Sequence, residues 1–321
     1  MNRRSLTNRN VLVIGGAGFI GSHLVDKLIA EKVRKIIIID NLFIGKKENI
    51  THALDNGAVF HIDDAENQEI LSYLIEKHNI DIVFNCATKA LNYSFINPSH
   101  AFLTNVIVLK NLLELQRKKA FQTLCHFSSS EAYGSAQYKP IDEQHPLIPE
   151  TTYAAGKASA DLMLQSYVNM FDLDAFIFRP FNNYGPRQNF EGPLAGVVPV
   201  TIKKILKGEA PEIHGSGQQT RDYIFVEDTV DLVLKAFPLI SPGDVVNIST
   251  DQQISIQYVV ETIVDVMEYQ GTIMKKPGRK ADVKSHRGST CKLEKMVGTY
   301  NPTPFKEGIS ATVNWVKKHV T

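Results

Sequence analysis

Tyr153 and Lys157 are the two residues whose types and spacing most directly suggest chemistry. They stand four positions apart at the start of a predicted helix, so both side chains project from one face. A phenol has a pKa of about 10, and an ammonium fixed beside it lowers that pKa by favouring the phenolate. Such a tyrosine can act as a base near neutral pH. The spacing alone is common on amphipathic helices, so the prediction depends on the surrounding residues.

Ser129, Ser130 and Glu131 would bring hydroxyl and carboxyl groups to the same place. They follow a predicted strand at residues 123–127, at the carboxyl edge of a sheet, where ligands bind in open α/β folds. A hydroxyl there can hydrogen-bond a substrate oxygen, and Glu131 offers a carboxylate within reach of the same substrate. Serine runs after strands are usually turns, so Glu131 is predicted as catalytic only because a cofactor site converges on this edge.

That cofactor site is predicted from the glycines Gly15, Gly18 and Gly21, which follow a strand at residues 11–14 and open a helix. Glycines allow a tight turn and the close approach of backbone to a pyrophosphate, whose charge then lies at the positive helix N-terminus. Asp40 ends the next strand, at the position where a carboxylate accepts hydrogen bonds from the adenosine ribose. A dinucleotide site is therefore predicted.

The cofactor is expected to be NAD, because the Asp40 carboxylate would repel the 2′-phosphate of NADP. Lys46 and Lys47 soften this preference, since a nearby cation could accommodate that phosphate. The predicted cofactor contacts are Gly15, Gly18, Phe19, Ile20, Gly21, Asp40, Asn41, Asp63, Asp64, Ala87, Asn105, Tyr153 and Lys157.

Strand and helix patterns alternate through the first half of the chain, which predicts an α/β fold with a doubly wound parallel Rossmann sheet. The strand patterns are apolar throughout, as in a sheet covered on both faces. They lie at 11–14, 35–39, 58–62, 82–86, 123–128 and 175–179, with helix patterns at 19–31, 66–77, 101–118 and 153–171. We expect residues 1–180 and about 223–250 to form the NAD-binding domain, and about 181–222 and 251–321 a smaller, discontinuous substrate lobe.

The composition excludes several classes of protein. With 321 residues, 43% hydrophobic and 21% charged, the chain is globular and not disordered. A net charge of +1 gives no global attraction to nucleic acid or to a membrane, so an anionic ligand would need local arginines. Three separated cysteines predict neither a metal site nor disulfides, and the apolar runs are too short to span a bilayer. A cytoplasmic protein is expected.

Together, Gly15-x-x-Gly18-x-x-Gly21, the Ser129 region, Tyr153-x-x-x-Lys157 and residues 179–186 (RPFNNYGP) resemble the extended short-chain dehydrogenase/reductase family. These are NAD-dependent nucleotide-sugar epimerases, dehydratases and decarboxylases. The resemblance implies that Tyr153 removes a sugar hydroxyl proton, that Lys157 binds the nicotinamide ribose and that Ser129 orients the substrate. It also implies a nucleotide diphosphate sugar as substrate and, as substrate contacts, Ser94, Asn182, Arg187, Val198, His214, Arg221 and Arg279. Among these, Asn182 would touch the phosphates, and Arg221 and Arg279 would clamp the diphosphate.

Glu131 is the informative departure within that family. Many 4-epimerases have no carboxylate there, because oxidation and re-reduction at C4 need no second base. Glucose-type 4,6-dehydratases resemble this chain but carry an acidic residue where Ser130 stands. Ser129-Ser130-Glu131 instead resembles mannose-type and amino-sugar dehydratases, and glucuronate decarboxylases, while residues 94–98 (SFINP) are closer to dehydratases and epimerases. A 4,6-dehydratase, a lyase of carbohydrate biosynthesis, is expected.

The alternatives within the class are a 4-epimerase and a uronate decarboxylase. Outside it stand a non-catalytic NAD-binding regulator, against which the intact Ser129, Tyr153 and Lys157 argue, and a dehydrogenase that releases NADH. A second departure, Asn85 in place of a common histidine, does not affect the cofactor prediction. The resemblance also implies a homodimer through the helices at 101–118 and 153–171, although the sheet could equally cover their apolar faces.

Overall fold

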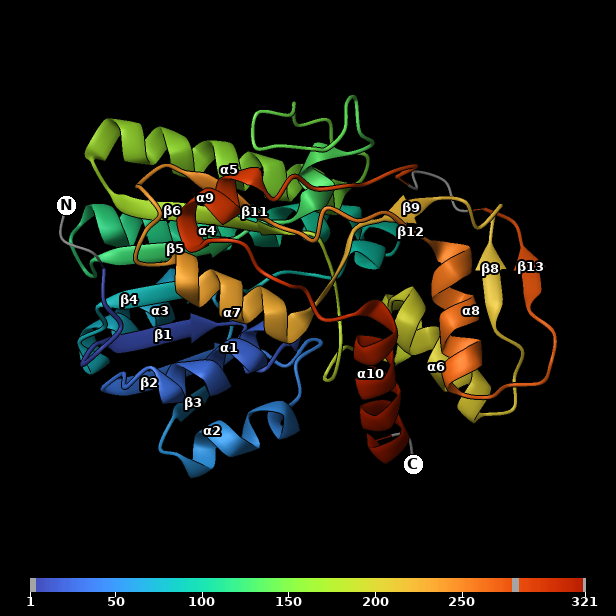
Figure 1. Ribbon diagram of the computed structural model, residues 1–321. Helices are drawn as coiled ribbons and strands as arrows, with labels where there is room; N and C mark the ends of the chain where they lie inside the picture. Colours follow the sequence, from blue (N-terminus) through green and yellow to red (C-terminus); the bar gives the residue numbers. More distant parts are fainter. Residues whose placement is uncertain (1–3, 279–282, 320–321) are drawn as a thin grey trace.

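The computed structural model describes residues 4–278 and 283–319. Its centre is a parallel sheet of seven strands in the order β11-β6-β5-β4-β1-β2-β3, which confirms the Rossmann-type α/β fold (Figure 1). The strands are β1 (Asn10–Ile14), β2 (Lys35–Asp40), β3 (Val59–Ile62), β4 (Ile82–Asn85), β5 (Thr123–Phe127), β6 (Asp174–Pro180) and β11 (Val245–Ile248). All of them except β3 are almost wholly buried, because helices cover both faces of the sheet.

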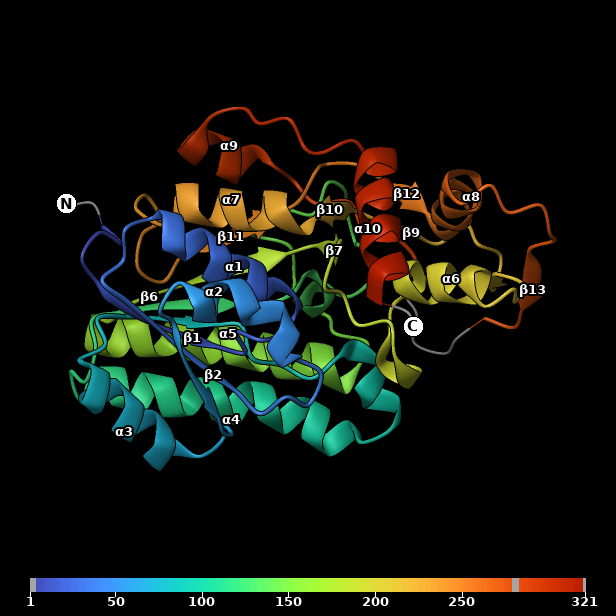
Figure 2. The same cartoon turned by 90° about the horizontal axis from the view of Figure 1, so that it is seen from below.

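The helices form two layers on opposite faces of the sheet (Figure 2). One layer holds α1 (Phe19–Ala30), α2 (Thr51–Asp55), α7 (Val226–Ala236) and α9 (Cys291–Val297); the other holds α3 (Gln68–His78), α4 (Pro98–Arg117) and α5 (Thr152–Phe171). Each layer has its own apolar cluster with the sheet, one containing Leu24 and Phe237 and the other Leu109 and Leu164. The sheet is thus enclosed, and its strand ends are left as the place for a ligand.

Helix α5 is positioned by its first turn and by one glycine. Thr151 caps the helix by accepting a hydrogen bond from the Ala154 amide at 3.2 Å. A Cβ on Gly156 would lie 2.7 Å from the Phe102 carbonyl oxygen of α4, so only glycine permits the observed contact of α4 and α5. This fixes the first two turns of α5, which carry Tyr153 and Lys157, at the carboxyl edge of the sheet.

The remaining chain forms a smaller lobe around α6 (Val197–Leu206), α8 (Ile256–Val266) and α10 (Phe305–His319), to the right in Figure 1. Its strand pairs are β7 (Asn182–Tyr184) with β10 (Tyr223–Phe225), β8 (Glu212–His214) with β13 (Met274–Lys276), and β9 (Thr220–Arg221) with β12 (Ile254–Ser255). Short 3-10 segments are η1 (Lys47–Ile50), η2 (Leu91–Phe95), η3 (Ser130–Tyr133) and η4 (Gly192–Leu194). The lobe has a separate apolar core that includes Tyr184, Val259 and Val313.

The division into an NAD-binding domain and a lobe remains a proposal, with two differences from the predicted boundaries. α9 packs against α7 and β11, so this part of the range 251–321 belongs with the sheet. β10 pairs with β7 and not with the large sheet, although it falls within the range 223–250. Periodicity cannot show either assignment, because both depend on contacts distant in sequence.

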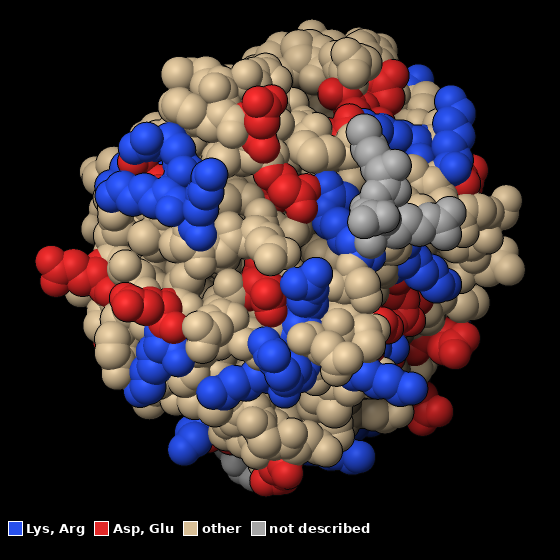
Figure 3. Space-filling model, turned by 90° about the vertical axis from the view of Figure 1, so that its left-hand side faces the viewer, with Lys and Arg blue, Asp and Glu red and all other residues tan. Residues whose placement is uncertain are grey.

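The surface and the helices agree with the composition. Figure 3 shows basic and acidic side chains interspersed over one face of the molecule, without a field of a single sign on that face. Within residues 4–278 and 283–319, no helix is long and apolar enough to cross a membrane. Over the same residues, no cluster of three or more histidine, cysteine or acidic side chains could hold a metal ion.

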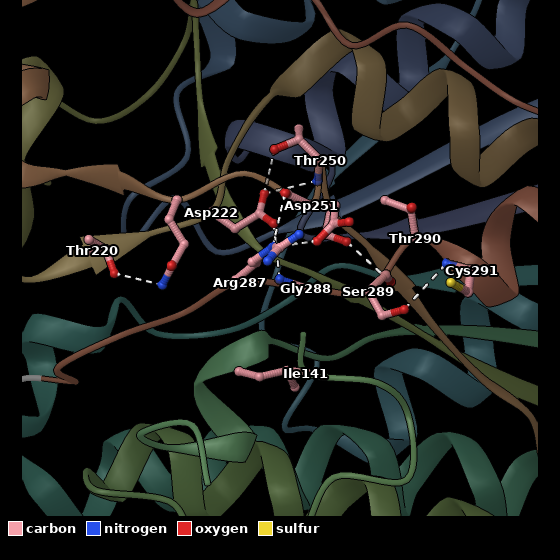
Figure 4. A network of polar contacts seen from close by, with 12 residues as sticks. Ile141, Thr220, Asp222, Thr250, Asp251, Arg287, Gly288, Ser289, Thr290 and Cys291 are labelled. Carbon is pink, nitrogen blue, oxygen red and sulfur yellow. Dashed lines mark hydrogen bonds and ion pairs between the residues drawn. The ribbon is translucent and has the colours of Figure 1, made fainter. Parts of the chain in front are cut away.

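A buried carboxylate, Asp222, joins the lobe to the sheet (Figure 4). Its Oδ1 accepts hydrogen bonds from the Thr250 amide at 2.9 Å and from the Thr250 hydroxyl at 2.7 Å, just after β11. Its Oδ2 accepts from the Gly288 amide at 3.0 Å, in the segment that leads to α9. Asp222 is 0% exposed, and burial raises its pKa to about 6. One side chain therefore holds together three segments that are far apart in the sequence.

We expect Asp222→Ala to lower the free energy of unfolding by about 3 kcal/mol, because two buried amides lose a charged acceptor. Urea denaturation followed by circular dichroism measures the change. Asp265→Ala is the control, since Asp265 pairs with Lys306 at the surface, and it should leave the midpoint nearly unchanged. Equal effects of the two substitutions would contradict the role given to Asp222.

Candidate active site

The glycine turn after β1 is closely packed on every side. Gly15 has φ +73°, and its amide donates to the Ile39 carbonyl at 2.8 Å. A Cβ on Gly15 would lie 2.9 Å from the Ala87 backbone, at the end of β4, and a Cβ on Gly21 would lie 2.2 Å from the Gly15 carbonyl oxygen. The turn therefore has no room for a side chain at Gly15 or Gly21, and α1 begins at Phe19. This is the cradle that a pyrophosphate needs.

Asp40 lies at the end of β2 with its carboxylate turned toward this cradle. One oxygen accepts from the Ala17 amide at 3.0 Å and the other from the Leu42 amide at 2.8 Å. Burial raises the pKa of Asp40, while these amide hydrogen bonds act in the opposite direction. A Cβ on Gly45 would come within 2.9 Å of both carboxylate oxygens, so the following loop packs directly on them. Asp40 is thus held where an adenosine ribose would lie beside the turn.

A cavity of about 300 Å³ runs from the glycine turn to Tyr153. The predicted cofactor residues that line it are Gly15, Gly18, Phe19, Ile20, Gly21, Asp40, Asn41, Asp63, Asp64, Ala87 and Tyr153. Asn41 donates to the Asp64 carboxylate at 2.8 Å, which joins the loops after β2 and β3. The structure therefore places most of the predicted cofactor residues around one cavity.

Two predicted residues take other positions than expected. Asn105 lies behind Thr88, whose hydroxyl donates to the Asn105 side-chain oxygen at 2.8 Å, and Thr88 itself lines the cavity. Arg187, expected at the substrate, lines the cofactor cavity and pairs with Asp26 of α1 at 2.6 Å. Sequence reasoning missed lining residues such as Phe43, Lys89, Gln188 and Asn189, which lie in loops without a pattern of their own.

Tyr153 is buried at the end of this cavity. Its amide donates to the Ser94 hydroxyl at 3.0 Å, so Ser94 contacts the start of α5. Burial raises the pKa of the Tyr153 phenol to about 12; the charge of Glu131 adds to the rise, and hydrogen bonding with Ser129 and Thr88 opposes it. This direction is opposite to the one expected from the sequence, because loss of solvent around the phenol outweighs the hydrogen bonds that favour its ionised form.

Lys157 lies one turn further along α5 and is only 2% exposed. Its ammonium donates to the Phe127 carbonyl at the end of β5, at 2.7 Å. Burial lowers the pKa of Lys157 to about 8, and the Asp161 carboxylate opposes this shift. Asp161 also accepts from Ser128 at 2.6 Å and pairs with buried Arg179 at 2.6 Å. Sequence reasoning missed Asp161; its place four residues after Lys157 was the available signal.

The short helix η3 begins at Ser130 and Glu131, directly after Ser129. It packs against α5 beside Tyr153. The Ser129 hydroxyl caps this segment by accepting from the Glu131 amide at 3.2 Å. Ser130 is buried, and Glu131 is 9% exposed. Because the charge of Glu131 acts on the Tyr153 phenol, the carboxylate and the phenol belong to one electrostatic unit. The structure thus brings two proton-accepting groups together.

Two of the predicted substrate residues of the lobe, Asn182 and Arg221, lie close along the backbone, because the Asn182 amide donates to the carbonyl of Asp222 at 3.0 Å. Asn182 is in β7, and its side-chain nitrogen has no hydrogen-bond partner among the described residues. Arg221, in β9, donates to the Val283 and Thr220 carbonyls. Val198 is buried in α6, and His214 lines a second cavity of about 50 Å³ against α6. Arg279 lies outside the described residues.

We expect Gly21→Ala to weaken NAD binding by at least about tenfold, because the added methyl group would displace the Gly15 carbonyl from the turn. Isothermal titration of the cofactor-stripped protein measures the affinity. Gly278→Ala is the control: the nearest atom to its Cβ would be 3.5 Å away, an ordinary contact. Full NAD affinity in Gly21→Ala would show that the turn is not the pyrophosphate site.

The pKa of Lys157 predicts how NAD binding depends on pH. Since that pKa is about 8 in the folded protein, the ammonium is lost as pH rises through about 8, and affinity should fall above that value. Folding has the opposite sign: between about 8 and the unfolded value of about 10.5 the unfolded chain holds more protons, so this group's contribution to stability rises with pH. Titrations between about pH 6.5 and 9.5 test the fall in affinity, which Lys157→Arg should remove because a guanidinium keeps its charge. If NAD affinity falls in the same way in Lys157→Arg, another group is responsible for the fall.

Known proteins that resemble this chain carry the same architecture. The family described as "NAD dependent epimerase/dehydratase family" matches residues 11–249. A putative UDP-glucose 4-epimerase of Methanocaldococcus jannaschii is 34% identical over 311 residues, 96% of this chain and 99% of that protein. The UDP-glucose 4-epimerase of Thermotoga maritima, solved with UDP-glucose, superposes with a TM-score of 0.90 at 31% identity, covering 97% and 100% of the two chains.

A dTDP-glucose 4,6-dehydratase of Streptomyces venezuelae, solved with NAD bound, also gives a TM-score of 0.90, at 25% identity over 96% of this chain and 97% of that one. The residues of this chain fit NAD, because the glycine turn and the carboxylate of Asp40 line the same cavity. NAD is therefore its cofactor. The chain belongs to the NAD-dependent epimerase/dehydratase family.

Proposed function

We propose that this enzyme is a nucleotide-sugar 4,6-dehydratase, which forms a 4-keto-6-deoxy sugar nucleotide. The observation that carries the proposal is the Glu131 carboxylate, which is almost buried beside the Tyr153 phenol and acts on its pKa. A reaction that only oxidises and re-reduces C4 needs one proton-accepting group. A dehydration needs a second one for the proton on C5, and Glu131 supplies it.

The chain's own residues divide the proton transfers as follows. Tyr153 takes the proton of the C4 hydroxyl, and the hydroxyls of Ser129 and Thr88 favour the ionised phenol by hydrogen bonding. The resulting ketone acidifies the C5 proton, which Glu131 accepts. That proton leaves with the C6 hydroxyl group as water. C5 regains a proton when hydride is delivered to C6, and the proton that Tyr153 took from the C4 hydroxyl supplies it, so the net loss is one water. When bound, NAD supplies the hydride acceptor for C4 and the hydride donor for C6.

Lys157 and its neighbours position this chemistry. The ammonium, held by the Phe127 carbonyl, lies one helical turn from Tyr153 and would contact the nicotinamide ribose. Asp161 keeps a negative charge beneath it and is itself fixed by Arg179 and Ser128. Glucose-type dehydratases otherwise resemble this chain, but they carry an acidic residue at the position of Ser130. Glu131 therefore handles both proton steps of the dehydration.

The lobe would hold the nucleotide diphosphate. Because the chain has a net charge of only +1, its phosphates need local donors, and Arg221, Arg279 and Asn182 are proposed for that role. The unpartnered side-chain nitrogen of Asn182 supports its assignment. Val198, which is buried in α6, and His214, which lines the second cavity, would face the nucleobase.

A homodimer through α4 and α5 is also proposed. These two helices lie side by side on one face of the sheet (Figure 2). They expose Leu103, Leu162 and Met170 although the sheet covers their other sides. A second copy packed on this face would cover those side chains.

A nucleotide-sugar 4-epimerase is the second candidate, favoured by the 34% identity to a putative UDP-glucose 4-epimerase. The two reactions share Tyr153, Lys157 and the transient oxidation of C4. They differ at Glu131, because an epimerase has no use for a base at C5. Substitution of this residue therefore separates them.

We expect Glu131→Gln to reduce the rate of water loss by at least about 100-fold, because removal of a positioned general base has an effect of this size. The first step, oxidation of C4, should continue and be visible as transient reduced cofactor absorbance. Product mass spectrometry and stopped-flow absorbance measure the two steps on the same sample.

Glu114→Gln is the matched control, since Glu114 lies at the far end of α4 and pairs with Arg117 at 2.8 Å. It should leave both steps unchanged. Water loss at the normal rate in Glu131→Gln would remove the base from the proposed mechanism. Normal interconversion of C4 configurations in the same variant would instead support the epimerase.

A further inference from the structure

The backbone of Lys46 lies next to the loop residue that packs on Asp40, the carboxylate expected to bind the adenosine ribose. The preceding residue, Gly45, packs against both oxygens of Asp40, and the Lys46 amide donates to the Ala17 carbonyl in the glycine turn at 3.1 Å. An ammonium at this position could reach the 2′ position of that ribose. It would then offset the repulsion between Asp40 and a 2′-phosphate.

The Lys46 side chain is held in another direction. Its ammonium lies 2.7 Å from a carboxylate oxygen of Glu191 and over the ring of Phe190, 4.8 Å from the ring centroid. Glu191 comes 145 residues later in the chain, just after β7 and before η4. The ammonium lowers the pKa of Glu191, so this carboxylate is charged at neutral pH. The positive charge of Lys46 is thus neutralised by a partner from another loop.

Glu191 is itself fixed at the rim of the cofactor cavity. The Asn189 side chain accepts from the Glu191 amide at 3.1 Å and donates to the Glu191 carbonyl at 3.0 Å. Asn189 and its neighbour Gln188 line the cavity. The carboxylate therefore projects from a segment next to the cavity wall, and the ion pair joins this segment to the loop that packs on Asp40.

We propose that Glu191 is a specificity-determining residue, which favours NAD over NADP by holding the Lys46 ammonium away from the 2′ position of the adenosine ribose. Asp40 repels a 2′-phosphate, and Glu191 holds back one cation, on the loop that packs against Asp40, that could compensate for it. The inference rests on the placement of the adenosine ribose at Asp40 and does not depend on the sugar chemistry. Both partners are partly exposed, with 36% and 55% of their side-chain surfaces accessible, so the pair is weak enough for Lys46 to change partner.

The test is isothermal titration of the cofactor-stripped full chain with NAD and with NADP, which needs no sugar substrate. Glu191→Gln should strengthen NADP binding by about fivefold at low ionic strength, the size expected of one partly screened charge contact. NAD affinity should change by less than about twofold, since NAD has no group at this position. The gain for NADP should disappear in high salt, because the contact is exposed.

Second substitutions identify the cation. Lys46→Met added to Glu191→Gln should abolish the gain, whereas Lys47→Met added to Glu191→Gln should keep it. Asp265→Asn, which removes a surface partner of Lys306 far from the cavity, should leave both affinities unchanged. An unchanged ratio of NADP to NAD affinity in Glu191→Gln would overturn the proposal. The proposal would also be overturned if adding Lys47→Met to Glu191→Gln, and not adding Lys46→Met, abolished the gain in NADP affinity. Failure of the dehydratase assignment would alter none of these outcomes.

Discussion

The close contact between the glycine turn and the end of β4 is the constraint on which the rest of the site depends. The Gly15 backbone approaches the Ala87 backbone so closely that a single methyl group would separate them. Because β1, β2 and β4 are neighbours in a parallel sheet, this contact brings the loops after all three strands to one cavity. Asp40 and Thr88 reach that cavity from either side of β1. The same edge carries η3 and the start of α5, so cofactor and catalytic groups meet without any long loop.

Burial favours the neutral form of both Tyr153 and Lys157. It raises the pKa of Tyr153 to about 12 and lowers that of Lys157 to about 8. Asp161 limits the second shift and is itself stabilised by Arg179, so a buried charge network lies beneath the site. The hydrogen bonds of Ser129 and Thr88 oppose the effect of burial on the Tyr153 phenol.

The sequence predicted the architecture well, because apolar strands and amphipathic helices alternate with clear periods and the glycine turn stands between a strand and a helix, with Asp40 at the end of the next strand. Most of the residues predicted to bind the cofactor line one cavity, since the ends of parallel strands must converge. Loop contacts could not be predicted: the pair Lys46–Glu191 joins segments 145 residues apart. The short strands β7 and β8 lay in a region where proline and glycine indicated loops. The pKa direction of Tyr153 was wrong, because a sequence shows the neighbouring charge but not the depth of burial.

Glu131 is the residue proposed to make this family member a dehydratase. The most direct measurement is product mass spectrometry after incubation of the purified protein with UDP-, GDP-, dTDP- and CDP-linked hexoses, hexosamines and uronates. The account predicts a product that has lost one water from a hexose or hexosamine and nothing else. A product of unchanged mass with inverted configuration at C4, or one that has lost carbon dioxide from a uronate, would contradict it.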